Sequence, residues 1–186
     1  MKKNLPSGTS RYFIAIVPPP PVFEEVQGLK NYFKEQYQSG AALNSPSHIT
    51  LHRPFLWSNK GEVFLISSLT DFSITQQPII LELSNFSSFP PRVIFTVVSE
   101  NEKLKKLQSE LDQFCKTTLH LFNAGYNDLS YRPHLTLAFR DLRKPMFARA
   151  WEEFKDRKFE ASFPVDKINL LRHNGDRWEP YRDFHF

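Results

Sequence analysis

Two short stretches decide how this chain is organised. The first reads Pro46-Ser47-His48-Ile49-Thr50-Leu51, and the second reads Arg132-Pro133-His134-Leu135-Thr136-Leu137. In both, a His, an apolar residue, a Thr and a second apolar residue follow one another. Polar and apolar residues that alternate in this way are typical of a strand with one buried face. The two stretches therefore predict equivalent strands in two similar halves of the chain.

The elements around these strands occur in the same order in both halves. Each half is predicted to read β-α-β-α-β with the His-x-Thr strand in the middle, over residues 11–87 and 92–164. A hairpin follows at 166–186, where Asn174-Gly175 can supply both positive φ values of a type I′ turn. No linker separates the halves. We therefore expect an α+β fold in which two pseudo-symmetric lobes form a single domain over residues 1–186.

Two helices are marked clearly by their sequence patterns. Apolar residues spaced three or four apart predict a helix over 22–37. The capping-box pattern Ser99-x-x-Glu102 predicts that another helix begins there. Each of these helices would directly precede a His-x-Thr strand, which supports the equivalence of the two halves.

The composition limits the class of protein. Of 186 residues, 40% are hydrophobic and 24% are charged, which excludes a wholly disordered or fibrous chain. The net charge of +4 leans toward phosphate-bearing partners without requiring one. The single Cys115 excludes an internal disulfide and indicates a reducing location, and no stretch approaches the ~18 apolar residues of a membrane span. We therefore expect a cytoplasmic protein, and a monomer by default.

The paired strands have a chemical meaning. Side chains two residues apart on a strand point to the same face, roughly 6.6 Å apart, so each His and its Thr can reach one small tetrahedral anion. If the halves are related by a pseudo-twofold axis, two imidazoles and two hydroxyls would surround one phosphate. Imidazole titrates near pH 6.5, so one ring can take a proton while the other gives one. Hydroxyls can donate to the phosphate oxygens as charge builds up.

The paired motifs resemble those of the 2H phosphoesterase superfamily, which includes RNA 2′,3′-cyclic phosphodiesterases and bacterial 2′-5′ RNA ligase-like proteins. The stretches Arg11-Tyr12-Phe13-Ile14-Ala15-Ile16 and 133–142 are also similar to that family. The resemblance implies two lobes whose sheets line a central groove with helices outside. It also implies metal-independent hydrolysis of 2′,3′-cyclic phosphates at RNA or nucleotide ends, with no cofactor.

The resemblance places four residues of this chain at the family's catalytic positions: His48, Thr50, His134 and Thr136. It implies that one His protonates the departing ribose oxygen and the other activates water, and we assign His48 as the acid and His134 as the base. The stretch Leu51-His52-Arg53-Pro54 departs from the pattern that many members share after the first motif, which leaves the substrate open. A non-catalytic module that binds RNA or a nucleotide phosphate, and a 2′-5′ RNA ligase, are the alternatives.

Other residues near the motifs are weaker candidates. Arg53, Arg132 and Arg140 could bind flanking phosphates of an RNA end, although such charges usually lie on a solvated rim. Tyr131 could stack on a base, and packing is the alternative. The tryptophans at 57, 151 and 178 are expected to pack rather than to bind.

A metal site is not expected on the first motif strand. His52 would share a strand face with His48, but four strand residues span roughly 13 Å, too far for two ligands of one zinc ion with ~2 Å bonds. His52 is therefore expected at the edge of the groove or in solvent.

Overall fold

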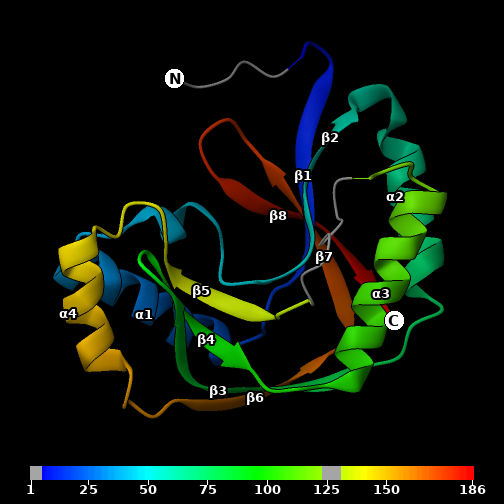
Figure 1. The fold of residues 1–186 in the computed structure, drawn as a ribbon. Coiled ribbons are helices and arrows are strands. Elements are labelled where there is room, and N and C mark those ends of the chain that lie inside the picture. The colour runs from blue at the N-terminus through cyan, green and yellow to red at the C-terminus, as the bar shows by residue number, and fades with distance from the viewer. Residues whose placement is uncertain (1–5, 123–130) are drawn as a thin grey trace.

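The computed structural model describes residues 6–122 and 131–186. Their strands form one antiparallel sheet of eight strands in the order β6-β3-β4-β5-β2-β1-β7-β8, which curls into an open arc (Figure 1). The strands are β1 (Thr9–Ile16), β2 (Ile49–Ser58), β3 (Ile79–Phe89), β4 (Val93–Val98), β5 (His134–Ala138), β6 (Glu160–Val165), β7 (Lys167–His173) and β8 (Trp178–His185).

Four α-helices cover the two ends of the arc: α1 (Val22–Tyr37), α2 (Glu62–Ser73), α3 (Glu102–Thr117) and α4 (Lys144–Phe154). Helices α1 and α4 lie together beside β4, β5 and β6, whereas α2 packs near β8 and α3 near β2 (Figure 1). The mixed α+β fold with two halves about a centre is confirmed. Strand β3 belongs to the first half of the sequence, 11–87, but it pairs with β4 and β6 of the second half, 92–164. The halves of the folded molecule therefore do not coincide with the halves of the sequence.

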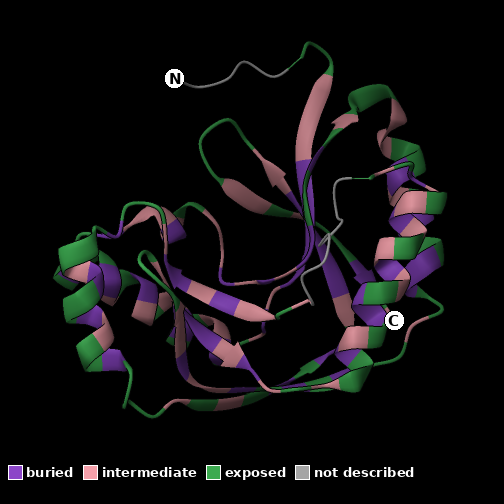
Figure 2. Cartoon of the chain, viewed as in Figure 1, coloured by how far each residue is buried: buried purple, intermediate pink, exposed green. Residues whose placement is uncertain are grey.

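The core lies between the sheet and the helices (Figure 2). The helix predicted over 22–37 forms as α1, and it buries Val22, Val26, Phe33 and Tyr37. A smaller apolar cluster of Phe13, Ala15 and Leu171 lies apart from this core. Since alternate residues of a strand point to opposite faces, Tyr12 and Ile14 belong to the helix-covered face and Phe13 to the other.

The first turns of two elements differ from the sequence-based expectation. Helix α3 is capped by Asn101, whose side chain accepts a hydrogen bond from the Leu104 amide at 3.0 Å, and not by Ser99. Asn and Ser are both preferred at the N-cap position, so an equivalent cap forms two residues later than the sequence pattern predicted. In the hairpin between β7 and β8, which lies wholly within the described residues, only Gly175 has a positive φ, of 104°. That value at the first central residue meets the requirement of a type II′ turn, so the type I′ prediction was wrong.

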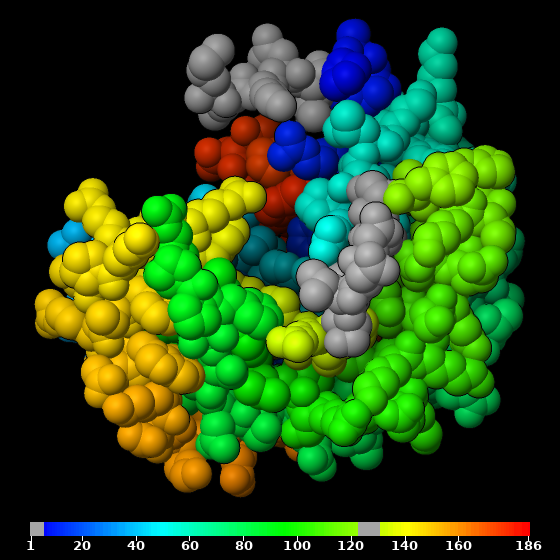
Figure 3. Space-filling view, in the orientation of Figure 1, coloured from blue at the N-terminus to red at the C-terminus, as the bar shows by residue number. Residues whose placement is uncertain are grey.

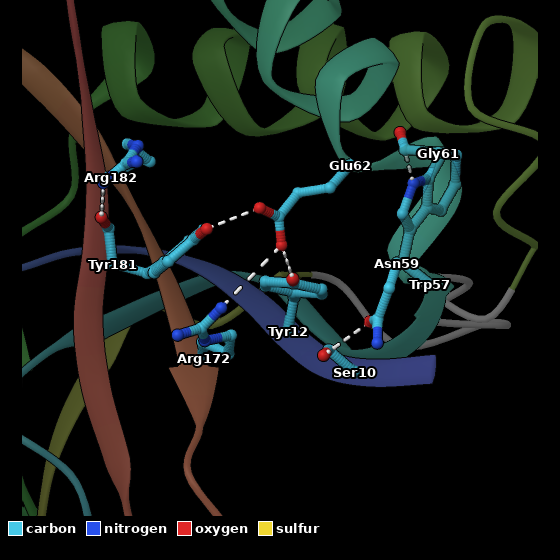
Figure 4. A network of polar contacts seen from close by, with 9 residues as sticks. All are labelled: Ser10, Tyr12, Trp57, Asn59, Gly61, Glu62, Arg172, Tyr181 and Arg182. Carbon is cyan, nitrogen blue, oxygen red and sulfur yellow. Dashed lines mark hydrogen bonds and ion pairs between the residues drawn. The ribbon is translucent and has the colours of Figure 1, made fainter. Parts of the chain in front are cut away.

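A polar network fixes the β7–β8 hairpin to the helix-covered face (Figure 4). Both carboxylate oxygens of Glu62 on α2 accept hydrogen bonds, one from the Tyr12 hydroxyl and one, at 2.5 Å, from the Tyr181 hydroxyl. Arg172 lies 3.8 Å from this carboxylate, and its guanidinium sits 4.0 Å above the Tyr181 ring. Because Tyr12 belongs to β1, the network holds three strands and a helix in fixed relative positions.

None of the helices in the described part of the chain has both the length and the apolar character needed to cross a membrane.

Candidate active site

The two motif strands meet at the centre of the sheet. Strand β2 pairs with β5 through Ile49 and Leu135, which face each other and are fully buried. In an antiparallel pair this register sets His48 opposite Thr136 and sets Thr50 opposite His134. Directly opposed Cβ atoms lie roughly 4.5–5.5 Å apart, and diagonal neighbours such as the two histidines lie roughly 7–8 Å apart. All four polar side chains are half-buried, on the face opposite to the two buried apolar residues.

The two imidazole rings are held in the same way. The Nδ1 atom of His48 lies 2.8 Å from the carbonyl oxygen of Pro46, and the Nδ1 atom of His134 lies 2.7 Å from that of Arg132. A carbonyl oxygen can only accept, so each bond requires the proton on Nδ1. Both Nε2 atoms are then left to exchange a proton with a ligand.

Each imidazole also packs against a phenylalanine from the neighbouring outer strand. The ring of Phe13 on β1 lies 4.8 Å from that of His48, and the ring of Phe95 on β4 lies 4.9 Å from that of His134, with interplanar angles of 55° and 52°. A second aromatic ring stands behind each phenylalanine, Trp178 at 4.7 Å from Phe13 and Phe89 at 4.6 Å from Phe95. These contacts limit the rotation of both imidazoles.

One cation breaks this symmetry. Lys30 on α1 is 1% exposed, and its Nζ atom donates to the carbonyl oxygens of Ala42 and Ser45, both at 3.2 Å. Those carbonyls belong to the segment that leads into His48. Asp141 holds the same segment from the other half of the chain, because its carboxylate accepts from the Ser39 hydroxyl at 2.8 Å and from two adjacent backbone amides.

Burial and this cation set the protonation of the site. Burial, followed by the charge of Lys30, lowers the pKa of His48 to about 4, against the opposing effect of the Pro46 carbonyl. Burial also lowers the pKa of His134, against the effect of the Arg132 carbonyl. Burial lowers the pKa of Lys30 itself to about 7. Both imidazoles are therefore neutral at pH 7 in the free protein, and an anion bound between them would raise both pKa values.

Two cavities lie near the motif strands. The larger one, about 720 Å³, borders Trp178 and is lined by Arg11, Asn44, Phe55 and Arg140 among others. The smaller one, about 450 Å³, borders His134 itself and is lined by further residues, including Phe89, Phe95, Tyr131 and Arg132. In the space-filling view, the hollow at the centre of the molecule opens between the red hairpin, the cyan β2 and the yellow segment after β5 (Figure 3).

The weaker candidates fall in different places. The Tyr131 hydroxyl donates to the Thr50 carbonyl oxygen at 3.0 Å, so this residue ties the two motif strands together while it lines the smaller cavity. Arg132 is exposed at the same cavity, and Arg140 is exposed at the larger one, with its guanidinium 4.9 Å above the Phe139 ring. Arg53 is exposed and lines neither of these two cavities.

The expectation for His52 was wrong. Ala15 pairs with Thr50 and Ile14 with His52, which leaves Leu51 as an extra residue in β2. This bulge turns His52 to the face opposite to His48, where it is 1% exposed. Its Nδ1 atom lies 2.8 Å from the Arg53 carbonyl oxygen, and its Nε2 atom has no hydrogen-bond partner among the described residues.

Metal ligands are not grouped in the described residues. Within 6–122 and 131–186, no three His, Cys, Asp or Glu side chains are placed to hold one ion.

Comparisons with known proteins place the chain in a family. Residues 18–177 match the model of the 2′-5′ RNA ligase superfamily. The chain belongs to this superfamily. A putative phosphoesterase of Bacillus pumilus is 28% identical over 167 residues, which cover 87% of this chain and 91% of that protein. The superfamily is the 2H phosphoesterase group that the motifs resemble.

Solved structures share the fold of this superfamily member. The crystal structure of E. coli LigT complexed with 3′-AMP aligns with a TM-score of 0.68 at 20% identity, and covers 96% of this chain and 98% of LigT. TT0787 of Thermus thermophilus aligns with a TM-score of 0.63 at 18% identity, and covers 94% of this chain and 97% of that one. These likenesses establish the architecture of the curled sheet.

The sequence-based search missed Lys30. The helical spacing from Val26 to Phe33 passes through position 30 as well as through Leu29. The apolar Leu29 was the obvious choice for the inward face, but Lys30 is the buried residue. A lysine at an inward position of an amphipathic helix is the signal that could have found it.

Proposed function

We propose that the protein is a metal-independent phosphodiesterase that opens a 2′,3′-cyclic phosphate at an RNA or nucleotide end. The observation that carries the proposal is the register of β2 and β5. It sets two imidazoles diagonally across a face that also holds two threonine hydroxyls, and neither Nε2 atom is bonded to a described residue. Membership of the 2′-5′ RNA ligase superfamily and the similarity to putative phosphoesterases support the same reading.

In the proposed reaction, a phosphodiester anion lies between the imidazoles and its negative charge raises both of their pKa values. Neutral His134 takes a proton from water through Nε2 as the water oxygen bonds to phosphorus. The bond from phosphorus to one ribose oxygen breaks, and protonated His48 gives its Nε2 proton to that oxygen. The product is a single nucleotide that carries a free ribose hydroxyl and a phosphomonoester on the neighbouring ribose oxygen. The Thr50 and Thr136 hydroxyls donate to the non-bridging oxygens as charge builds up on them.

The cavities support the roles proposed for the two histidines. The leaving oxygen stays on the nucleoside, so the acid must stand on the side where the nucleoside lies. The larger cavity adjoins His48 through Phe13 and Trp178. This supports His48 as the acid and His134, on the narrower side, as the base.

The charge of Lys30 bears on the same step. A cation near an imidazolium makes that ring a stronger acid, because loss of the proton relieves the repulsion between them. Proton transfer from His48 to the leaving oxygen is therefore favoured once the substrate anion has drawn a proton onto the ring.

The test is hydrolysis of adenosine 2′,3′-cyclic phosphate in the presence of EDTA, followed by chromatography of the product. We expect turnover by the native protein and a loss of about 10²–10⁴-fold in kcat for His48→Ala and for His134→Ala. His185→Ala, which removes an exposed histidine of β8, is the matched control and should retain full activity. Absence of turnover in the native protein, or unchanged turnover in both variants, would overturn the proposal. Tight binding without product would instead favour a non-catalytic module.

A further inference from the structure

The larger cavity extends the groove beyond the space that a single phosphate needs. Along β1, Arg11 lies two residues from Phe13 on the same face, roughly 6.6 Å away. Trp178 of the hairpin packs on Phe13, which packs on His48. The cavity lined by Arg11 and Trp178 is therefore linked to the first imidazole by two successive ring contacts.

The lining of this cavity suits a single-stranded polyanion. Arg11 is half-buried, and it makes no ion pair with any acidic side chain of residues 6–122 and 131–186. Arg140 stands exposed at the same cavity, where Asp176 is the only carboxylate among the described lining residues. A basic groove that also holds an aromatic side chain is the usual composition of single-strand binding sites, in which bases stack on rings and cations contact phosphates.

The indole of Trp178 lines the cavity and is half-buried. The rings of Phe13 and His173 pack on it at interplanar angles of 86° and 87° and help to fix its orientation. The hairpin that carries Trp178 is anchored by the network around Glu62, which holds Tyr181 of β8. The indole is therefore presented to the cavity by a rigid element.

The cavity beside His134 differs in size and in the pairing of its cations. It measures about 450 Å³, against about 720 Å³ for the cavity lined by Arg11. Its Lys105 is already bonded to Glu100 and, at 2.8 Å, to Glu102, which leaves Arg132 as the other cation of its lining. Of the two cavities, the one lined by Arg11 and Trp178 is therefore the better match for a nucleic-acid strand.

We propose that the cavity lined by Arg11 and Trp178 binds the nucleotides that precede the reacting phosphate in a single-stranded RNA. This inference rests on the proposed function and makes the preferred substrate an oligonucleotide end rather than a mononucleotide. Trp178 stacks on the base of the preceding nucleotide, and Arg11 pairs with its phosphate. The strand leaves the site over His48, which places the leaving ribose oxygen beside that imidazole.

The experiment compares two substrates, adenosine 2′,3′-cyclic phosphate and the trinucleotide ApApA that ends in a 2′,3′-cyclic phosphate. The native protein should show a higher kcat/KM on the trinucleotide. In Arg11→Ala and Trp178→Ala the ratio of the two kcat/KM values should fall roughly tenfold, the effect of losing one stacking or phosphate contact. For the trinucleotide, log(kcat/KM) should also fall less steeply with log[salt] in Arg11→Ala than in the native protein, with a slope smaller in magnitude by about 0.7.

The pseudo-symmetric positions provide matched variants. Phe89 packs on Phe95 as Trp178 packs on Phe13, but its ring also lies 5.4 Å from the ring of His134. Phe89→Ala should therefore lower kcat/KM for both substrates alike, so the ratio should stay at the native value. Lys158→Ala, which removes an exposed lysine between α4 and β6, should alter neither substrate. An unchanged ratio in both Arg11→Ala and Trp178→Ala, or a fall in the ratio only in Phe89→Ala, would overturn the inference.

Failure of the proposed function is seen separately. If the native protein hydrolyses neither substrate, the proposed function fails, and the cavity is then tested by binding alone. Fluorescence anisotropy of a 5′-labelled ApApA 3′-phosphate should show a weaker Kd for Arg11→Ala and Trp178→Ala than for the native protein and Lys158→Ala. Equal Kd values in all four proteins would overturn the inference as well.

Discussion

The two sides of the candidate site are alike at the imidazoles and unlike behind them. Each histidine is held through Nδ1 by a carbonyl two residues earlier, and each packs on a phenylalanine of the adjacent strand. Behind His48, however, lie a buried lysine and a large cavity, whereas His134 adjoins a smaller cavity. A repeated motif can thus supply two matching groups whose surroundings differ, and the proposed roles of the two histidines rest on that difference.

The largest expected effect is a difference between the His48 and His134 variants when the leaving group of the substrate is changed. Bis(p-nitrophenyl) phosphate is symmetric, and its leaving group departs without needing a proton. The fold-loss of activity in His48→Ala should therefore be at least tenfold smaller on this ester than on a cyclic nucleotide. On the cyclic nucleotide, a general acid contributes about 10²–10⁴-fold. His134→Ala should lose activity on both substrates. Steady-state kinetics at pH 7 measure this, and recovery in the His134 variant alone would reverse the assigned roles.

A smaller effect tests whether the hydroxyls are equivalent. Thr50→Val and Thr136→Val keep the β-branched shape and remove one donor each. We expect both to lower kcat by similar factors, up to about 10²–10³-fold, because each hydroxyl donates to one phosphate oxygen in the transition state. Thr70→Val, on the exposed side of α2, is the control. A loss confined to one of the two site variants would show that only one strand contacts the phosphate.

The charge behind His48 is tested by Lys30→Met, which keeps most of the buried chain and removes the cation. The pKa of His48 should rise from about 4, because the second cause of its lowering is gone, while burial still keeps it below its ordinary value. The pKa of His134, which is lowered by burial, should not move. NMR titration of the imidazole Cε1 protons measures both values. An equal shift of the two rings, or none, contradicts the role given to Lys30.

The smallest expected effect is on stability. It concerns His52, which lies in the core, whereas His48 and His134 lie in the groove. Burial lowers the pKa of His52 in the folded chain. The unfolded chain therefore binds more protons than the folded chain below about pH 6.5, and the free energy of unfolding falls as the pH drops through that range. His52→Leu should reduce this fall, by less than about 1.4 kcal/mol per pH unit.

Urea denaturation of His52→Leu and of the native protein between pH 7 and pH 5 measures that change. The same slope in both proteins would mean that His52 titrates alike in the folded and unfolded chains.

The sequence predicted the parts of the site that depend on local spacing. Alternation alone placed His48 and Thr50 on one strand face, and the bounds of α1 followed from the helical repeat. The bulge at Leu51 could not be read from the sequence, because it arises from the pairing of β1 with β2, and it moved His52 from the groove face to the core. The burial of Lys30 was equally hidden, since its partners are two backbone carbonyls of the irregular segment that follows α1.

In the proposed function, both motif strands hold one phosphate. The most direct measurement is a crystal structure of the protein soaked with 3′-AMP, the ligand found with the similar LigT fold. We expect a phosphate within about 2.7–3.2 Å of both histidine Nε2 atoms and both threonine hydroxyls, with the nucleoside on the His48 side. A phosphate held by one strand alone, or bound outside the groove, would contradict it.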